Sequence, residues 1–138
     1  MIRKIMISMF FTSVIFGYDL KHNRNINCLA SAIYHEARGE SRKGKIAVGY
    51  VILNRIKRGY GDNPCEIVSA KNQFSWFGKR LAVKEKEKWI ECYRLSKKIL
   101  LDETKDPTNG SIFFHEKTIR PGWKYKRVAV IDNHVFYK

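Results

Sequence analysis

Apolar residues recur with a helical period in the first half of the chain. Between residues 26 and 39 they fall at i, i+1, i+4, i+5 and i+8, which is one face of a helix that we expect to stop at Gly39. Ser41 is a candidate N-cap for a second helix over residues 42–58, whose apolar residues cover most of its circumference. A helix that is apolar on nearly all sides is buried, so we expect this one at the centre of the core.

Capping signals predict a third, short helix, and amphipathic spacing predicts a fourth. Asn63, Pro64 and Glu66 form a start that resembles a capping box, for a helix that ends near Ala70. After an aromatic loop, the residues from about 83 to 101 place apolar side chains on one face and lysines and glutamates on the other. We therefore expect four helices, separated by loops, as far as residue 101.

The remaining residues favour strands. A turn signal at residues 106–110 is followed by β-type residues at 111–115 and 127–137. Within the second stretch, Asp132 and Asn133 are typical of a two-residue hairpin turn. The pattern predicts an α+β domain that is mostly α, with a small C-terminal β-hairpin.

The first twenty residues differ from the rest. Arg3 and Lys4 precede a nearly apolar stretch at residues 5–16, the order of charge and hydrophobicity found in secretory signals. We expect residues 1–20 to be a signal peptide or uncleaved signal-anchor, and residues 21–138 to be one folded domain, exported to the periplasm or cell envelope. The alternative is that this stretch is the first buried element of the fold.

The chain is strongly basic. Its 138 residues include 27 Lys plus Arg against 13 Asp plus Glu, a formal net charge of +14. Such a charge attracts polyanions, among them nucleic acid, anionic membranes and anionic cell-wall polymers. The alternative is that the lysines only keep the protein soluble. Charge by itself does not choose among these.

Cysteines and histidines give no metal signature. The three cysteines are too few for a disulfide scaffold and lack the spacing of a zinc site. In an oxidising compartment a Cys65–Cys92 bridge is conceivable, but the sequence leaves the pairing open. The four histidines, at positions 22, 35, 115 and 134, have no metal-binding spacing, so we expect no metal and no cofactor.

Two polar clusters could carry chemistry. Glu36 and Glu40 lie four residues apart where the first helix ends, and burial there would raise a carboxyl pKa, as a general acid requires. Arg38 and Arg42 would act in the opposite direction, and a solvated helix end with surface ion pairs is the alternative. The second cluster, residues 73–77, mixes aromatic rings with amide and hydroxyl groups, which suits sugars or stacked nucleic-acid bases. Its first ring, Phe74, could instead belong to the core.

Four blocks of sequence together resemble the SleB-type cell wall hydrolase family. They are residues 28–40, which contain Glu-Ala-Arg-Gly-Glu; residues 44–55, which end in Asn-Arg; residues 72–76, Asn-Gln-Phe-Ser-Trp; and residues 133–137. The resemblance runs from about residue 27 to the C-terminus in the order of the family. It implies a lysozyme-like fold similar to that of lytic transglycosylases.

The resemblance also implies an activity and a set of site residues. The activity is cleavage of the β-1,4 bond between N-acetylmuramic acid and N-acetylglucosamine in peptidoglycan. Glu36 corresponds to the catalytic acid/base of the family and Glu40 to a supporting residue. The expected substrate-binding residues are Gln73, Phe74, Ser75, Trp76, Phe114, His115 and Tyr137.

One acid/base suffices for a lytic transglycosylase, which leaves a 1,6-anhydro product. A muramidase that uses water is the alternative, and a basic nucleic-acid-binding module or an inactive wall-binding module are further ones. In a further alternative the chain has the same enzymatic activity but serves as a phage or bacterial lysin held by a signal-anchor.

The expected partners are peptidoglycan glycan strands and anionic cell-wall polymers, with no nucleic acid. We expect a monomer that touches a membrane only through its N-terminal segment.

Overall fold

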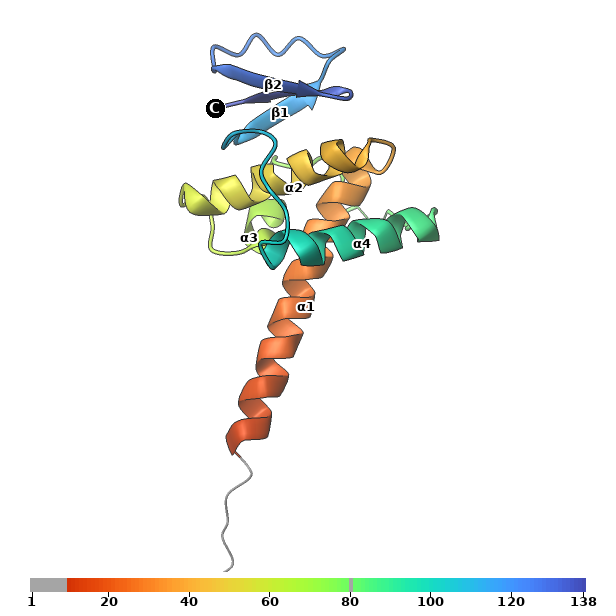
Figure 1. The fold of residues 1–138 in the computed structure, drawn as a ribbon, viewed down its shortest axis with the longest axis vertical. Helices are drawn as coiled ribbons and strands as arrows, with labels where there is room; N and C mark the ends of the chain where they lie inside the picture. The colour runs from red at the N-terminus through yellow and green to blue at the C-terminus, as the bar shows by residue number, and fades with distance from the viewer. Residues whose placement is uncertain (1–9, 80) are drawn as a thin grey trace, which may run out of the picture.

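A small antiparallel sheet lies over a set of crossing helices in the computed structural model, which describes residues 10–79 and 81–138 (Figure 1). The N-terminal part of the first helix extends away from the rest of the protein (Figure 1). The elements in chain order are α1 (Phe10–Ala37), α2 (Arg42–Lys57), α3 (Pro64–Ser69), α4 (Lys86–Leu100), β1 (Phe113–Glu116), β2 (Arg127–Ile131) and β3 (His134–Tyr137).

Helix α2 is the centre of the molecule, as its apolar circumference predicts. It begins after Ser41, whose hydroxyl accepts a hydrogen bond from the backbone N–H of Gly44 at 3.2 Å. Most of its residues from Gly44 to Arg55 are buried, and it contacts the other three described helices as well as β1 and β2. Figure 1 shows it between the sheet and the other helices.

Two apolar clusters hold the fold together. One fills the space between the helices and includes Leu29, Ile52 and Leu95. The other joins α2 to the sheet, where Phe136 is completely buried and packs with Ala37, the last residue of α1. Because burying such an aromatic side chain contributes about 1.5–3 kcal/mol, this second cluster fixes the end of α1 against the sheet.

Helix α4 begins slightly later than its sequence predicts. The Tyr34 hydroxyl accepts hydrogen bonds from the backbone N–H groups of Lys84 and Glu85, each at 3.1 Å. These bonds tie the segment before α4 to α1, so the helix starts at Lys86 instead of about residue 83. The short α3 starts as expected, with the Asn63 side chain accepting from the N–H of Glu66.

The sheet has three strands in the order β1-β3-β2, and both pairs are antiparallel. The hairpin predicted at Asp132-Asn133 connects β2 and β3, and Asp132 adopts a φ of 50° there. Strand β1 adds to the other edge of β3, with Phe114 opposite Phe136. The α+β prediction is confirmed, and the hairpin is part of a slightly larger sheet.

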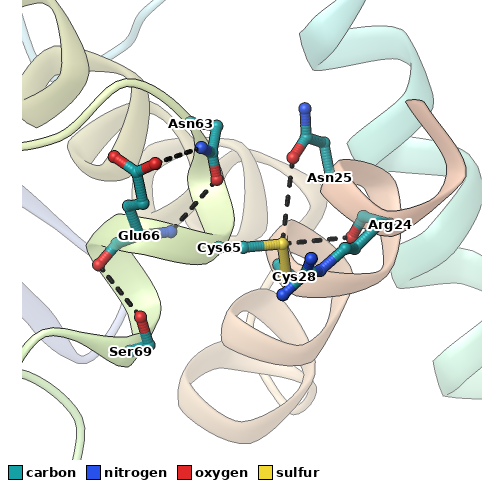
Figure 2. The surroundings of a disulfide bond; sticks show 7 residues. All are labelled: Arg24, Asn25, Cys28, Asn63, Cys65, Glu66 and Ser69. Atoms are coloured by element: carbon teal, nitrogen blue, oxygen red, sulfur yellow. Dashed lines mark hydrogen bonds between the residues drawn. A yellow bond between two sulfur atoms is a disulfide. The ribbon is translucent and has the colours of Figure 1, made fainter. Parts of the chain in front are cut away.

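The disulfide joins Cys28 of α1 to Cys65 of α3, with their Cα atoms 5.1 Å apart (Figure 2). The conceivable Cys65–Cys92 bridge is therefore wrong. Cys92 points from α4 into the apolar helical core, where burial raises the pKa of its thiol to about 11. The fold leaves Cys65 next to α1 and encloses Cys92 among apolar side chains.

Helix α1 is longer than the apolar pattern indicates, because it begins at Phe10 and not near residue 26. Residues 10–26 contain no proline, so the backbone hydrogen bonds of the helix continue through them. Of the expected signal segment, residues 1–9 lie outside the described residues. In the part of the chain that the structure describes, no helix combines the length and apolar character needed to cross a bilayer.

Candidate active site

Glu36 lies in the last turn of α1 and is hydrogen-bonded to a distant loop. Its Oε1 accepts a hydrogen bond from the indole Nε1 of Trp76 at 2.7 Å. The Trp76 ring also stacks on the ring of His35, with 4.7 Å between their centroids. Both Glu36 and Trp76 are half-buried. The fold thus brings the two polar clusters of the sequence together.

The surroundings of Glu36 favour its protonated form. Burial is the largest influence and raises the pKa of the Glu36 carboxyl, and the negative charge of Glu116 also raises it. The Trp76 hydrogen bond and the positive charge of Arg55 act in the opposite direction but do not reverse the shift. A carboxyl that keeps its proton to higher pH than usual is what a general acid needs. Arg38, which was expected to oppose this shift, instead forms an ion pair with Glu85 at 2.8 Å.

Arg55 is a site residue that the sequence interpretation did not select. It is only 9% exposed, and its Nε donates to the carbonyl oxygen of Ile112 at 2.8 Å. Its guanidinium lies 5.7 Å from the ring centroid of Phe74 and 5.9 Å from that of Phe113. Burial lowers the pKa of Arg55, while the charge of Glu36 raises it, so the two side chains influence each other. The sequence does contain a signal that could have identified Arg55, namely a charged side chain within a helix that is otherwise apolar on nearly all sides.

Glu40 fastens the hairpin turn to the end of α1. Its carboxylate accepts hydrogen bonds from the backbone N–H of Asn133 at 3.2 Å and from Asn133 Nδ2 at 3.1 Å. Next to it, Asp132 accepts from the N–H and the hydroxyl of Ser41, at 2.9 and 2.6 Å. Glu40 therefore has a structural contact of the kind expected of a supporting residue, and its effect on activity stays a prediction.

The three residues before Trp76 lie in different surroundings. Phe74 is 7% exposed and belongs to the helical core, so its ring packs inward and anchors the loop to the helices. Gln73 and Ser75 are exposed, and Gln73 lines a small cavity together with Arg55 and Phe113. Their contact with substrate stays a prediction.

The structure separates the predicted residues of the sheet into two groups. Phe114 faces the helices, where it packs against both apolar clusters and lies edge-on to His134 at 5.2 Å between centroids. His115 Nε2 and the Tyr137 hydroxyl are 2.8 Å apart, on the opposite face. Because successive side chains of a strand alternate between faces, His115 and Tyr137 do not share a surface with Phe114. The seven residues expected to bind substrate are therefore divided between two surfaces, and the contact of His115 and Tyr137 with substrate stays a prediction.

The family model described as Cell Wall Hydrolase matches residues 39–137, well over half of the chain. The chain belongs to the cell wall hydrolase family. Among its relatives is the spore cortex-lytic enzyme of Oceanobacillus iheyensis, 30% identical over 128 residues, which cover 88% of this chain and 43% of the relative. The spore cortex-lytic enzyme of Halalkalibacterium halodurans is 30% identical over 131 residues, 91% of this chain and 37% of the relative. The chain thus spans less than half the length of these curated relatives.

Two solved structures share the fold of this chain. The catalytic domain of the Bacillus cereus SleB protein superposes with a TM-score of 0.64 and 26% identity, covering 85% of this chain and 91% of that one. The catalytic domain of the germination-specific lytic transglycosylase SleB from Bacillus anthracis gives a TM-score of 0.63 and 26% identity, covering 83% and 93%. The expected SleB-type fold is confirmed. The family match begins three residues after Glu36, so the assignment of Glu36 depends on its geometry and on the sequence resemblance.

The outer face of the sheet carries an aromatic cluster, which we call the outer aromatic face. Its rings contact one another, for example Phe113 with Tyr125 at 4.4 Å between centroids and His115 with Trp123 at 5.4 Å. A cavity of about 470 Å³ opens on this face, and three cations line it. The members of the outer aromatic face are Phe113, His115, Trp123, Tyr125 and Tyr137, and the cations are Lys117, Arg120 and Arg127.

Among residues 10–79 and 81–138, no group of three or more His, Cys, Asp or Glu side chains could hold a metal ion. His35 is instead stacked on Trp76, and His115 bonds to Tyr137. His134 is buried against Phe114. These three rings therefore have roles in packing and hydrogen bonding.

Proposed function

We propose that the chain cleaves the β-1,4 bond between N-acetylmuramic acid and N-acetylglucosamine in peptidoglycan, as a lytic transglycosylase with Glu36 as its single acid/base. The observation that carries this proposal is the half-buried Glu36 carboxyl, whose pKa is raised by burial and which Trp76 holds in place. Membership of the cell wall hydrolase family supports the substrate. The Bacillus anthracis neighbour, described as a lytic transglycosylase, favours that reaction over hydrolysis by a muramidase.

In the proposed reaction Glu36 acts twice. Its proton passes to the glycosidic oxygen as the bond from that oxygen to the anomeric carbon breaks. The 2-acetamido group of the muramic residue stabilises the oxocarbenium-like centre while Glu36 is a carboxylate. Glu36 then takes the proton of the muramic 6-hydroxyl, whose oxygen bonds to the anomeric carbon and closes the 1,6-anhydro ring. In a muramidase a water molecule would take the place of that hydroxyl.

The Glu36→Gln variant tests the proposal. Glutamine keeps the shape and can still accept the Trp76 hydrogen bond, but it has no proton to transfer, so muropeptide release from purified sacculi should fall by about two to four orders of magnitude. The matched control is Glu87→Gln, which changes an exposed carboxylate on α4. Near-wild-type release by Glu36→Gln would refute the assignment. Mass spectrometry of the products separates the two reactions, because the anhydro sugar is lighter by one water.

We also propose that anionic cell-wall polymers bind to the outer aromatic face. Trp123 is 39% exposed there and lies beside Lys117, Arg120 and Arg127. A sugar ring can stack on the Trp123 indole while an anionic group of the same polymer binds the three basic side chains. Binding of the Glu36→Gln variant to sacculi should weaken as salt rises, and should weaken further in Trp123→Ala. Binding that is independent of salt would count against this proposal, as would preferential binding to single-stranded nucleic acid.

For the N-terminal part we propose export, with residues 1–20 as signal peptide or signal-anchor and residues 21–138 as a monomeric catalytic domain in the cell envelope. The supporting observation is the order of Arg3 and Lys4 before the apolar stretch at 5–16. Fusing residues 1–20 to a reporter that is active only after export tests the first part. A cytoplasmic fusion would contradict it, and size-exclusion chromatography of residues 21–138 tests the second part.

A further inference from the structure

A small cavity lies beside Arg55 and combines polar and apolar walls. Its volume is about 110 Å³, more than one water molecule needs and less than a whole ligand pocket usually has. It therefore has room for a substituent of a sugar and not for the sugar itself. Arg55, Tyr60 and Gln73 line its polar part, and the apolar part includes Ile67, Ile112 and Phe113.

Arg55 lines this cavity and carries a hydrogen-bond donor that has no partner among the described residues. The side chain is 9% exposed, and its Nη1 is buried without a hydrogen-bond partner among the described residues. Within residues 10–79 and 81–138, Arg55 also forms no ion pair, although it is a buried cation. Burying a charged donor without partners is costly, so such a group is usually matched to an acceptor.

We propose that the Arg55 cavity binds the N-acetyl group of a sugar in the glycan strand, with the acetyl carbonyl oxygen accepting a hydrogen bond from the Arg55 guanidinium. This proposal rests on the proposed function, since it names a recognition site for the same substrate. An acetamido group matches both halves of the cavity. Its methyl group fits against Ile112 and Phe113, and its polar atoms lie next to Arg55 and Gln73.

A neutral acceptor suits this cavity better than an anion. A carboxylate or phosphate would use the cation but would leave its other oxygens against the apolar walls, which is unfavourable. Moreover, the negative charge of Glu36 already acts on Arg55. An N-acetyl carbonyl adds one strong hydrogen bond without adding a second negative charge near the catalytic carboxyl.

Oligosaccharide binding to the inactive Glu36→Gln protein tests the site separately from catalysis. N-acetylglucosamine tetramer carries the acetamido groups, and cellotetraose is a neutral tetramer without them. In the Glu36→Gln background we compare Gln73→Glu, Gln73→Ala and Asn72→Asp. Gln73→Glu places a carboxylate where it can occupy Arg55 itself. Asn72→Asp makes the same charge change at an exposed neighbour that does not line the cavity, and Asp tolerates its left-handed φ of 62°.

We expect the acetylated tetramer to bind more tightly than cellotetraose by about tenfold to a hundredfold, as measured by calorimetry or NMR titration. Gln73→Glu should remove most of that difference, Gln73→Ala should reduce it less, and Asn72→Asp should keep it. Arg55→Lys, checked for folding by circular dichroism, should also lose the preference. Equal binding of the two tetramers, including no measurable binding of either, would overturn the proposal. So would an unchanged preference in Gln73→Glu. Failure of the proposed function would show itself separately, as catalysis that survives Glu36→Gln.

Discussion

The indole Nε1 of Trp76 donates a 2.7 Å hydrogen bond to Oε1 of Glu36, linking the aromatic loop to the end of α1. This bond favours the charged carboxylate and so lowers the pKa of Glu36, although burial raises that pKa by more. Trp76 therefore has two effects, since it orients the carboxyl and limits how strongly the carboxyl holds its proton.

Replacing Trp76 with Phe should move the pH profile of the enzyme. The variant lacks the bond that favours the charged form, so the pKa of Glu36 should rise further and the alkaline limb of kcat/KM should shift to higher pH. Rates of muropeptide release at a series of pH values measure this limb. Trp89→Phe is the control, because that indole contacts the ring of Tyr34 and not Glu36. A limb that stays in place, or moves to lower pH, contradicts the role given to Trp76.

Glu36 should also reduce the stability of the native protein at neutral pH. Its pKa is raised on folding, so the native state loses stability as pH rises from the ordinary carboxyl value, about 4.3, through the higher folded value. Glu36→Gln removes the ionisable group and should have a larger free energy of unfolding than wild type near neutrality. The difference should vanish below the ordinary carboxyl pKa. Urea unfolding at both pH values measures it, and a variant less stable than wild type at neutral pH would contradict the burial of this carboxyl.

Local signals were sufficient to predict most elements of the fold, although not where α1 begins. Ser41 caps α2 through the N–H of Gly44, three residues away, and Asn63 caps α3 in the same manner through Glu66. The hairpin turn at Asp132-Asn133 likewise depends on adjacent residues. These features involve interactions within one turn of backbone, so the residue types alone indicate them.

The contacts that build the site could not be predicted in this manner. Glu36 and Trp76 are 40 positions apart, and Arg55 meets Ile112 across 57. Which face of β1 carries His115 depends on how the sheet packs on α2, and a shift of one residue would exchange the two faces. The resemblance names Phe114 and His115 together as substrate-binding residues because it compares positions along the chain and carries no information about faces.

Glu40→Gln should destabilise the protein moderately and reduce activity less than Glu36→Gln does. Glutamine has one side-chain acceptor where the carboxylate has two, so one of the two bonds from Asn133 is lost, at a cost of about 1 kcal/mol. Urea unfolding and muropeptide release measure the two effects. In a double-mutant cycle with Asn133→Ala the combined cost should be smaller than the sum, because both changes affect the same contact. Complete loss of activity in a folded Glu40→Gln protein would reverse the roles of the two glutamates.

Loss of the Cys28–Cys65 bridge should lower the free energy of unfolding substantially. The bridge closes a segment with a sequence separation of 37, and removing a disulfide of this kind costs about 3 kcal/mol. The double variant Cys28→Ser with Cys65→Ser should therefore unfold at lower urea concentration than oxidised wild type. With reductant, wild type should unfold at the same urea concentration as the double variant, whose own unfolding should not change.

Cys92→Ser distinguishes this pairing from the one that the sequence left open. Because Cys92 is a buried free thiol, its variant should keep the bridge and should still lose stability on reduction, by the same amount as wild type. A bridge between Cys65 and Cys92 predicts the opposite, namely that Cys92→Ser is insensitive to reductant. The stability that Cys92→Ser loses on reduction therefore decides whether Cys28 or Cys92 is bonded to Cys65. The serine itself adds only a small cost in the core, and this cost is the same with and without reductant.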